Sequence, residues 1–206
     1  MNQQEHWEKI YQTKTMEEVS WYQPEPAVSI EFIRQLRIPL TASIIDVGGG
    51  DSLFADYLLQ MGYTNITVLD ISSTALEKAK KRLGQNAAKV KWIVSDVNAF
   101  RSSEKYDVWH DRAAFHFLIT EDAIAQYLSV AANSLKPGGK LIIGTFSETG
   151  PAKCSGLPVK QYSETSLTTI LSNWFQKIKC MTSDHRTPFN TVQQFLFCSF
   201  QKLILP

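Results

Sequence analysis

Short apolar runs alternate along this chain with stretches in which apolar residues recur every three or four positions. The apolar runs are typical of buried strands, and they predict strands at 43–47, 65–70, 89–95, 106–110 and 140–146. The periodic stretches between them predict helices at 51–62, 74–84 and 120–135. Strands that alternate with helices of this length indicate βαβ units, so we expect an α/β fold with a doubly wound, mostly parallel sheet.

The C-terminal part of the chain breaks this alternation. After a helix expected near 163–172, strand-like runs at 175–183 and 192–203 are separated only by DHRTPFNT. A parallel connection needs a crossover of about a dozen residues or more, so these two strands should form an antiparallel pair. In an open parallel sheet, ligands bind beyond the carboxyl ends of the strands. The residues directly after each strand are therefore the first candidates for a site.

The turn GGGDS (48–52) follows the first predicted strand and precedes a helix. Aligned from Gly48, the dinucleotide fingerprint G-x-G-x-x-G/A would require a small residue where this chain has Leu53. A pyrophosphate also favours bare amide groups at a helix N-terminus, whereas Asp46 and Asp51 put carboxylates around this turn. Such a turn suits a ligand that carries an ammonium group better than one that carries a phosphate.

The segment IIDVGGGDS (44–52) resembles motif I of the class I S-adenosylmethionine-dependent methyltransferases, whose usual form is hh(D/E)hGxGxG. Asp46, Gly48 and Gly50 match this motif, and Ser52 occupies the position of its third glycine. Later landmarks of the family follow in order, and they are Asp70 at the end of the second strand, SDV (95–97) after the third, LKPGGKLII (135–143) at the turn into the fifth, and the closing hairpin. The resemblance extends over 21–203.

The resemblance implies a Rossmann-like sheet with a C-terminal antiparallel hairpin. It also implies S-adenosylmethionine as the cofactor, whose methyl group passes to an acceptor by in-line displacement. In this family the acid at Asp70 binds both ribose hydroxyls, and the acid at Asp96 lies at the adenine. The residues that the resemblance assigns to the cofactor are Asp46, Gly48, Gly50, Ser52, Asp70, Ile71, Asp96 and Val97.

Two further segments resemble a bacterial branch of this family, HWEKIYQTKTMEEVSWYQPEP (6–26) and GPAKCSGLPV (150–159). We expect one domain over 1–206, divided into an N-terminal helical cover (1–37), a cofactor-binding core (43–146) and a substrate loop with the C-terminal hairpin (147–206). The cover is rich in aromatic residues, namely Trp7, Tyr11, Trp21 and Tyr22. They could belong to the core, or they could form a lid that attracts the sulfonium and excludes water, with Trp21 and Tyr22 at the cofactor.

The stretch WHDRAAFH (109–116) supplies candidates for the acceptor side, next to the end of the fourth strand. His110 and His116 are candidate general bases, because an imidazole titrates near neutral pH. We expect Asp111 and Arg112 to contact the substrate, although they could also be an ordinary cap and ion pair. Cys154 lies in the following loop and is expected at the substrate, without acting as a nucleophile. Together these groups indicate a polar acceptor, anionic or neutral.

Composition removes several other classes of protein. The 206 residues include 21 basic and 20 acidic side chains, which does not favour an extended nucleic-acid surface or a polybasic membrane patch. The first residues lack the pattern of a secretory signal, and no apolar run is long enough to span a membrane. Three widely spaced cysteines predict reduced thiols in a cytoplasmic protein, with neither a metal site nor a disulfide framework.

The preferred interpretation is a methyltransferase that acts on a polar small molecule, and the oligomeric state is left open. A protein-lysine methyltransferase is the alternative within the class, because the covering N-terminal segment also resembles that group. Two alternatives come from outside it. A nicotinamide-dependent oxidoreductase is disfavoured by Leu53, Asp51 and the hairpin, and a protein that binds S-adenosylmethionine without catalysis stays open.

Overall fold

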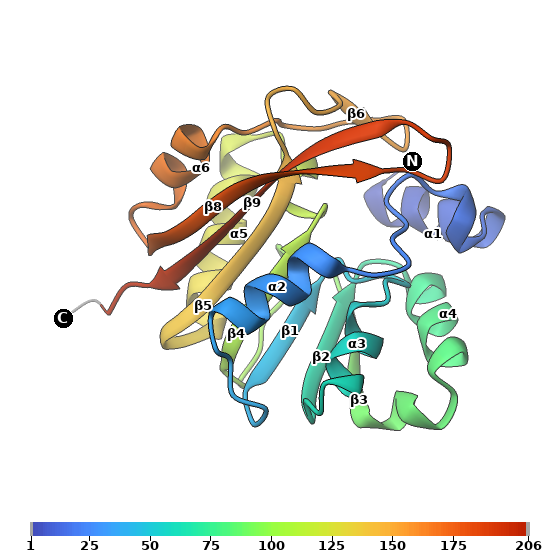
Figure 1. Cartoon of the computed structure of the whole chain (residues 1–206), viewed down its shortest axis with the longest axis horizontal. Coiled ribbons are helices and arrows are strands. Elements are labelled where there is room, and N and C mark those ends of the chain that lie inside the picture. Colours follow the sequence, from blue (N-terminus) through green and yellow to red (C-terminus); the bar gives the residue numbers. More distant parts are fainter. Residues whose placement is uncertain (1, 205–206) are drawn as a thin grey trace.

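A seven-stranded sheet forms the centre of the structure, a computed structural model in which residues 2–204 are described (Figure 1). The strand order is β3-β2-β1-β4-β5-β9-β8. The strands are β1 (Ser43–Val47), β2 (Asn65–Asp70), β3 (Val90–Val94), β4 (Tyr106–Arg112), β5 (Leu135–Phe146), β8 (Phe175–Arg186) and β9 (Val192–Lys202). The first five are parallel, whereas β9 runs antiparallel to both β5 and β8. The predicted fold class, including the C-terminal antiparallel pair, is confirmed.

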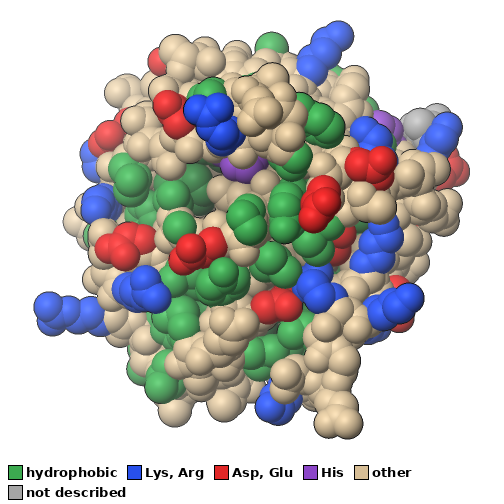
Figure 2. Space-filling view, turned by 45° about the vertical axis from the view of Figure 1, so that its right-hand side comes forward, with side chains coloured by type: hydrophobic (Ala, Val, Ile, Leu, Met, Phe, Trp, Pro, Cys, Tyr) green, Lys and Arg blue, Asp and Glu red, His purple; other side chains and the backbone are tan. Residues whose placement is uncertain are grey.

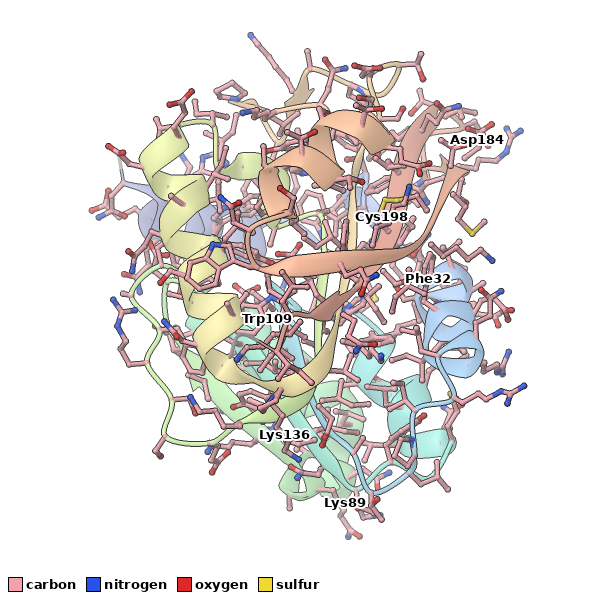
Figure 3. The ribbon with its side chains drawn as sticks, turned by 90° about the vertical axis from the view of Figure 1, so that its left-hand side faces the viewer. Phe32, Lys89, Trp109, Lys136, Asp184 and Cys198 are labelled. Carbon is pink, nitrogen blue, oxygen red and sulfur yellow. A yellow bond between two sulfur atoms is a disulfide. The ribbon has the colours of Figure 1, made fainter. Side chains whose placement is uncertain are left out.

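Helices cover both faces of this sheet. One face packs on α2 (Ala27–Gln35), α3 (Phe54–Gln60) and α4 (Ser73–Leu83), and the other packs on α5 (Glu121–Ser134) and α6 (Glu164–Leu171). Figure 3 shows these layers from the side, with Phe32 of α2 and Trp109 of β4 marking two of them. Strands buried on both faces read as continuous apolar runs, which explains why the sequence pattern located them.

The β4–β5 pair differs from the prediction at both ends. β4 continues to Arg112, which pairs with Gly144, so the strand is two residues longer than its apolar run. β5 begins at Leu135, because the KPGG segment that was predicted as a turn joins the strand across a register shift opposite Tyr106 and Val108. The two added residues, Asp111 and Arg112, therefore belong to the strand, and their side chains point to opposite faces of the sheet.

The N-terminal segment lies across the carboxyl edge of the sheet. It comprises α1 (Gln3–Thr13) and the short 3-10 helix η1 (Met16–Glu18), and α1 contacts the start of α4 (Figure 1). The Glu8 carboxylate accepts from the backbone N–H groups of Ser73 (2.6 Å) and Thr74 (3.2 Å). Burial raises the pKa of Glu8, but the hydrogen bonds from Thr74 and Ser73 outweigh this and lower it overall. A carboxylate at a helix N-terminus is favoured by the free amides there, so Glu8 holds α1 on α4.

The cysteine prediction is wrong for two of the three residues. Cys180 on β8 and Cys198 on β9 are directly opposite each other in the antiparallel register and form a disulfide, whereas Cys154 is free and buried. The hairpin brings together two residues that are 18 positions apart in the sequence. Disulfides are rare in reducing compartments, so the pair removes the argument that reduced thiols provided for a cytoplasmic location.

The surface of the molecule on the side of α1 and α4 carries acidic and basic side chains interspersed among apolar ones (Figure 2). Within residues 2–204, no helix combines the length and the apolar character that a membrane crossing requires.

Candidate active site

The glycine turn after β1 has a backbone that only glycine adopts without strain at two positions. Gly48 and Gly50 have φ values of 64° and 52°. A Cβ on Gly48 would collide with the side chain of Ala114, and one on Gly50 would collide with the Tyr11 hydroxyl. The turn is therefore enclosed between the end of β4 and the cover. The Ser52 hydroxyl accepts from the backbone N–H of Phe54 (3.1 Å) and so stabilises the start of α3.

Two connected chambers lie beyond the carboxyl ends of the strands. The inner chamber, next to the glycine turn, has an empty volume of about 570 Å³ and the outer one about 810 Å³, both including space open to solvent. Four residues line both chambers, and they are Tyr11, Trp21, Gly48 and Arg112.

Asp70 faces the outer chamber from the last position of β2. Its side chain is nearly buried, and Oδ1 accepts from the backbone N–H of Ser72 (2.8 Å). Burial raises the pKa of Asp70 to about 7, against the hydrogen bonds from Ser72 and Gly50, and the nearby Asp46 and Asp51 raise it further. None of the ion pairs among the described residues includes Asp70. A buried carboxylate of this kind, without a cation, suits neutral donors such as sugar hydroxyls.

The outer chamber has apolar walls on either side of Asp70. Ile71 and Val97 line it, as the sequence predicted for residues at the cofactor, and Phe117 and Leu118 line it from the segment after β4. Asp96 also lines the chamber, but its side chain is exposed and accepts from the backbone N–H of Asn98 (2.8 Å) within its own turn.

The aromatic residues of the cover close the outer chamber from above. The ring centroid of Trp7 lies 5.0 Å from that of Phe117 and 5.6 Å from that of Trp21, and the Tyr11 and Trp21 rings are 6.2 Å apart. Burial, and then the charges of Asp70 and Asp51, raise the pKa of Tyr11 well above its usual value. Tyr22 lines only the inner chamber. These side chains thus pack on one another and line the site at the same time.

The inner chamber contains a chain of three buried polar side chains. Asp46 Oδ1 is 2.7 Å from His110 Nδ1, and His110 Nε2 is 2.8 Å from the Ser29 hydroxyl. The Phe54 ring stacks on the imidazole at 4.0 Å. Both ring nitrogens of His110 are engaged in these contacts, and the residue lines the inner chamber but not the outer one, so its role as a general base stays a prediction.

Asp111 is misplaced by the sequence analysis. Because β4 extends to Arg112, successive side chains alternate between the two faces, and Asp111 points towards α5. It accepts from the Tyr127 hydroxyl (2.7 Å) and from the backbone N–H groups of Ala114 and Phe115. Burial raises its pKa to about 6, although these hydrogen bonds act in the opposite direction. Asp111 thus stabilises the turn after β4 and lies away from both chambers.

His116 is fully buried in the 3-10 helix η3 (Phe115–Phe117), with its ring 4.5 Å from that of Phe146. It lines neither chamber, so the rim position predicted for it is wrong as well. Burial and the neighbouring Arg112 cation lower its pKa to about 3, which leaves the imidazole neutral at physiological pH.

Arg112 and Cys154 are the two acceptor candidates that line the outer chamber. Arg112 Nη1 donates to the backbone carbonyl of Trp21 (2.9 Å), and its guanidinium lies 5.0 Å from the Phe195 ring centroid. Cys154 comes from β6 (Lys153–Cys154), which pairs with β7 (Leu157–Pro158) in the loop above the sheet. Burial raises the pKa of the Cys154 thiol, which keeps it protonated.

Sequence reasoning missed several residues of the site. Ser29 and Phe54 sit on helices α2 and α3 and carry no motif, so nothing in the sequence pointed to them. Phe117 and Leu118 directly follow the WHDRAAFH segment, and their apolar character in a loop after a strand was a usable signal.

Residues 44–139 match a family model described as "Methyltransferase domain". The segment from β1 to the start of β5, somewhat less than half of the chain, is therefore similar to a methyltransferase domain. The chain is 27% identical over 107 residues to malonyl-[acyl-carrier protein] O-methyltransferase 2 of Ilyobacter polytropus, which is 52% of this chain and 40% of that one. It is 26% identical over 160 residues to EEF1A lysine methyltransferase 2 of Homo sapiens, 70% of this chain and 68% of that one.

The fold of this chain is similar to that of solved S-adenosylmethionine-dependent methyltransferases. A methyltransferase of this kind from Anabaena variabilis has a TM-score of 0.76 to this chain at 16% identity, with 98% of this chain and 96% of that one covered. Other structural neighbours were crystallised with S-adenosylhomocysteine. The chain spans less than half the length of several curated relatives that it matches.

The residues around the two chambers are chemically suited to S-adenosylmethionine. Asp46, Asp51 and Asp70 are buried carboxylates around the glycine turn, which suit ammonium and hydroxyl groups and oppose a pyrophosphate. Burial raises the pKa of Asp51, although Arg82 and Lys78 lower it. The space that a Cβ on Gly50 would need is occupied by Tyr11, so the turn has no room for a larger residue.

Replacing His110 by alanine should destabilise the domain by about 2–4 kcal/mol, because it opens a cavity and leaves the buried Asp46 carboxylate without its partner. Urea unfolding measures this effect. Ser29→Ala removes one hydrogen bond at the far end of the same chain and should cost about 1 kcal/mol. Unchanged stability together with reduced turnover in His110→Ala would instead support the general-base assignment.

Proposed function

We propose that this protein transfers the methyl group of S-adenosylmethionine to a polar small molecule that enters the outer chamber beside Arg112 and Cys154. The observation that carries this proposal is the set of three buried carboxylates around the glycine turn, Asp46, Asp51 and Asp70. A nicotinamide dinucleotide would place two phosphates on this turn, and their charges would be repelled. The curated relatives include a ubiquinone biosynthesis O-methyltransferase of Rickettsia canadensis, which also supports the proposal.

In this proposal each cofactor contact has a physical reason. Asp70 accepts from the ribose hydroxyls, and Ile71, Val97 and Asp96 bind the adenine. Asp46, held by His110 and Ser29, faces the amino-acid end together with Gly48, Gly50 and Ser52. Trp21 and Tyr22 cover this end from above.

Bound S-adenosylmethionine supplies a methyl group on a sulfonium centre, which is reactive without an enzyme nucleophile. The protein then has to align the acceptor with this group and exclude water, and alignment alone can be worth about 7–11 kcal/mol. Trp7, Tyr11 and Trp21 provide the exclusion of water from the outer chamber, and their aromatic faces suit a cation.

Methylation of a protein lysine is a second candidate. It is favoured by the match to EEF1A lysine methyltransferase 2, which extends over 70% of this chain. A lysine acceptor must lose a proton before it attacks, and the buried, neutral His116 lies away from both chambers. This placement supports the small-molecule proposal over the lysine one.

Calorimetry with S-adenosylhomocysteine and NAD tests the proposed cofactor directly. We expect S-adenosylhomocysteine to bind and NAD to give no signal, because the carboxylates of the glycine turn repel its phosphates. Binding of NAD, with no response to S-adenosylhomocysteine, would refute the proposal. Mass spectrometry of ligands that stay bound through purification provides an independent check.

A further inference from the structure

The Arg112 guanidinium forms no ion pair with any residue of 2–204. Among these residues its side chain makes one hydrogen bond, from Nη1 to the backbone carbonyl of Trp21. Nε and Nη2 are inaccessible to solvent and have no partner within the described part of the chain. The Asp46 carboxylate is already bonded to His110.

The guanidinium stays charged in this environment. Burial lowers the pKa of Arg112 to about 10, with Cys154 and Asp46 opposing the shift, so the group is protonated at neutral pH. A buried charge and two buried donors without partners are both unfavourable for folding. A site keeps such an arrangement when a ligand supplies the missing anion, since unsatisfied groups of this kind concentrate at functional sites.

The surroundings of Arg112 indicate which ligand supplies it. The guanidinium stacks on Phe195 of β9, and Arg112 and Cys154 line the outer chamber together. These neighbours come from the C-terminal part of the chain, beyond the methyltransferase core, whereas the ribose acid Asp70 comes from β2. Arg112 therefore lines the outer chamber next to residues of the C-terminal part of the chain, and it also lines the inner chamber.

We infer that the methyl acceptor carries a carboxylate that pairs with the Arg112 guanidinium, with a shift of the side chains that cover Nε and Nη2 in the ligand-free protein. This inference rests on the proposed methyltransferase function and deepens it. The planar guanidinium presents these two N–H groups in the geometry that matches a carboxylate, and such charge-assisted pairs are among the strongest polar contacts. The apolar side chains of Trp7, Phe117 and Leu118 in the same chamber suit an apolar body attached to that carboxylate.

The experiment uses calorimetry on the protein saturated with S-adenosylhomocysteine. Acetate, butyrate and benzoate serve as probes, each compared with its uncharged amide. We expect the best carboxylate to bind at least about tenfold more tightly than its amide, and we expect Arg112→Met to abolish this preference. Lys153→Met is the control, because it removes an exposed cation next to Cys154. This variant should keep the preference for the carboxylate over its amide. Equal binding of acids and amides, or a preference that survives in Arg112→Met, would overturn the inference.

A second comparison separates an acceptor carboxylate from that of the cofactor itself. Arg112→Met should bind S-adenosylhomocysteine and methylthioadenosine, which lacks the amino-acid end, as tightly as the unaltered protein. If only S-adenosylhomocysteine binding fell by about tenfold or more, Arg112 would hold the cofactor and the inference would be wrong. Absence of S-adenosylhomocysteine binding to the unaltered protein would instead refute the proposed function.

Thermal unfolding of the ligand-free proteins distinguishes a ligand-binding role of Arg112 from a structural one. A structural role would lower the unfolding temperature of Arg112→Met, whereas a ligand-binding role would not. Arg112→Met should unfold at the same temperature as the unaltered protein or at a higher one, because the uncompensated charge is removed. A lower unfolding temperature together with unchanged carboxylate binding would assign Arg112 to the fold alone.

Discussion

Replacing Asp70 by alanine is expected to weaken the binding of S-adenosylhomocysteine by roughly 10- to 150-fold. The carboxylate would lose charge-assisted hydrogen bonds from the ribose hydroxyls, worth about 1.5–3 kcal/mol in total, at about 1.4 kcal/mol per tenfold change. Calorimetry measures the affinity directly. The fold should persist, because the Ser72 hydroxyl accepts from the backbone N–H of Ala75 and caps α4 independently of Asp70.

Asp96→Ala is the matched control, since Asp96 is exposed and bonded within its own turn, and its removal should have a smaller effect. An unchanged affinity in Asp70→Ala would show that the acid at the end of β2 does not contact the cofactor.

The ionisation of Asp70 should also make cofactor binding depend on pH. Because burial raises the pKa of Asp70 to about 7, the carboxyl is increasingly protonated below neutral pH and can no longer accept from both hydroxyls. Affinity of the unaltered protein should therefore rise with pH up to about 8 and then level off, and Asp70→Asn should remove this dependence. Asp46, Asp51 and Tyr11 are the other titratable groups that face Asp70.

The stability of the ligand-free protein should change in the opposite sense. A carboxyl whose folded pKa is raised favours folding while it is protonated, so its contribution is present below about pH 4 and is lost as the pH rises through about 7. Unfolding in urea across this range, with Asp70→Asn as the reference, would detect it.

Deleting residues 1–22 is expected to cost cofactor affinity by at least about tenfold and to affect thermal stability less. Trp7, Tyr11 and Trp21 line the outer chamber, so their loss opens the site to water. The sheet and helices α3–α5 keep their own apolar cores without this segment. Calorimetry and thermal unfolding of the truncated protein measure both effects.

Tyr11 and Val19 are buried, so the truncated protein could also unfold. Trp7→Ala then provides the less disruptive variant, and Glu8→Gln tests the attachment of α1 to the start of α4. Hydrogen exchange of residues 3–22 in the intact protein should slow when S-adenosylhomocysteine is added. Unfolding of the truncated protein, without ligand-dependent protection of this segment in the intact one, would assign these aromatics to the core.

The sequence by itself determined most of the elements, their order and several residues that line the outer chamber. Buried parallel strands are apolar throughout and are bounded by polar turns, so their positions could be read directly. The glycine turn, Asp70, Ile71 and Val97 follow strand ends, which the fold class places at one edge of the sheet. Local pattern was sufficient here because each of these residues is positioned by its own strand.

Only the tertiary structure decided the acceptor side, because the positions there depend on pairing between distant segments. β4 extends to Arg112 through its pairing with β5, and that register turns Asp111 towards α5 while His110 and Arg112 face the cover. Cys180 and Cys198 meet only through the register of the β8–β9 hairpin. Whether Arg112 has a counterion depends on which side chains of α2, β6 and β9 surround it, and the spacing of residues along a chain carries no information about such contacts.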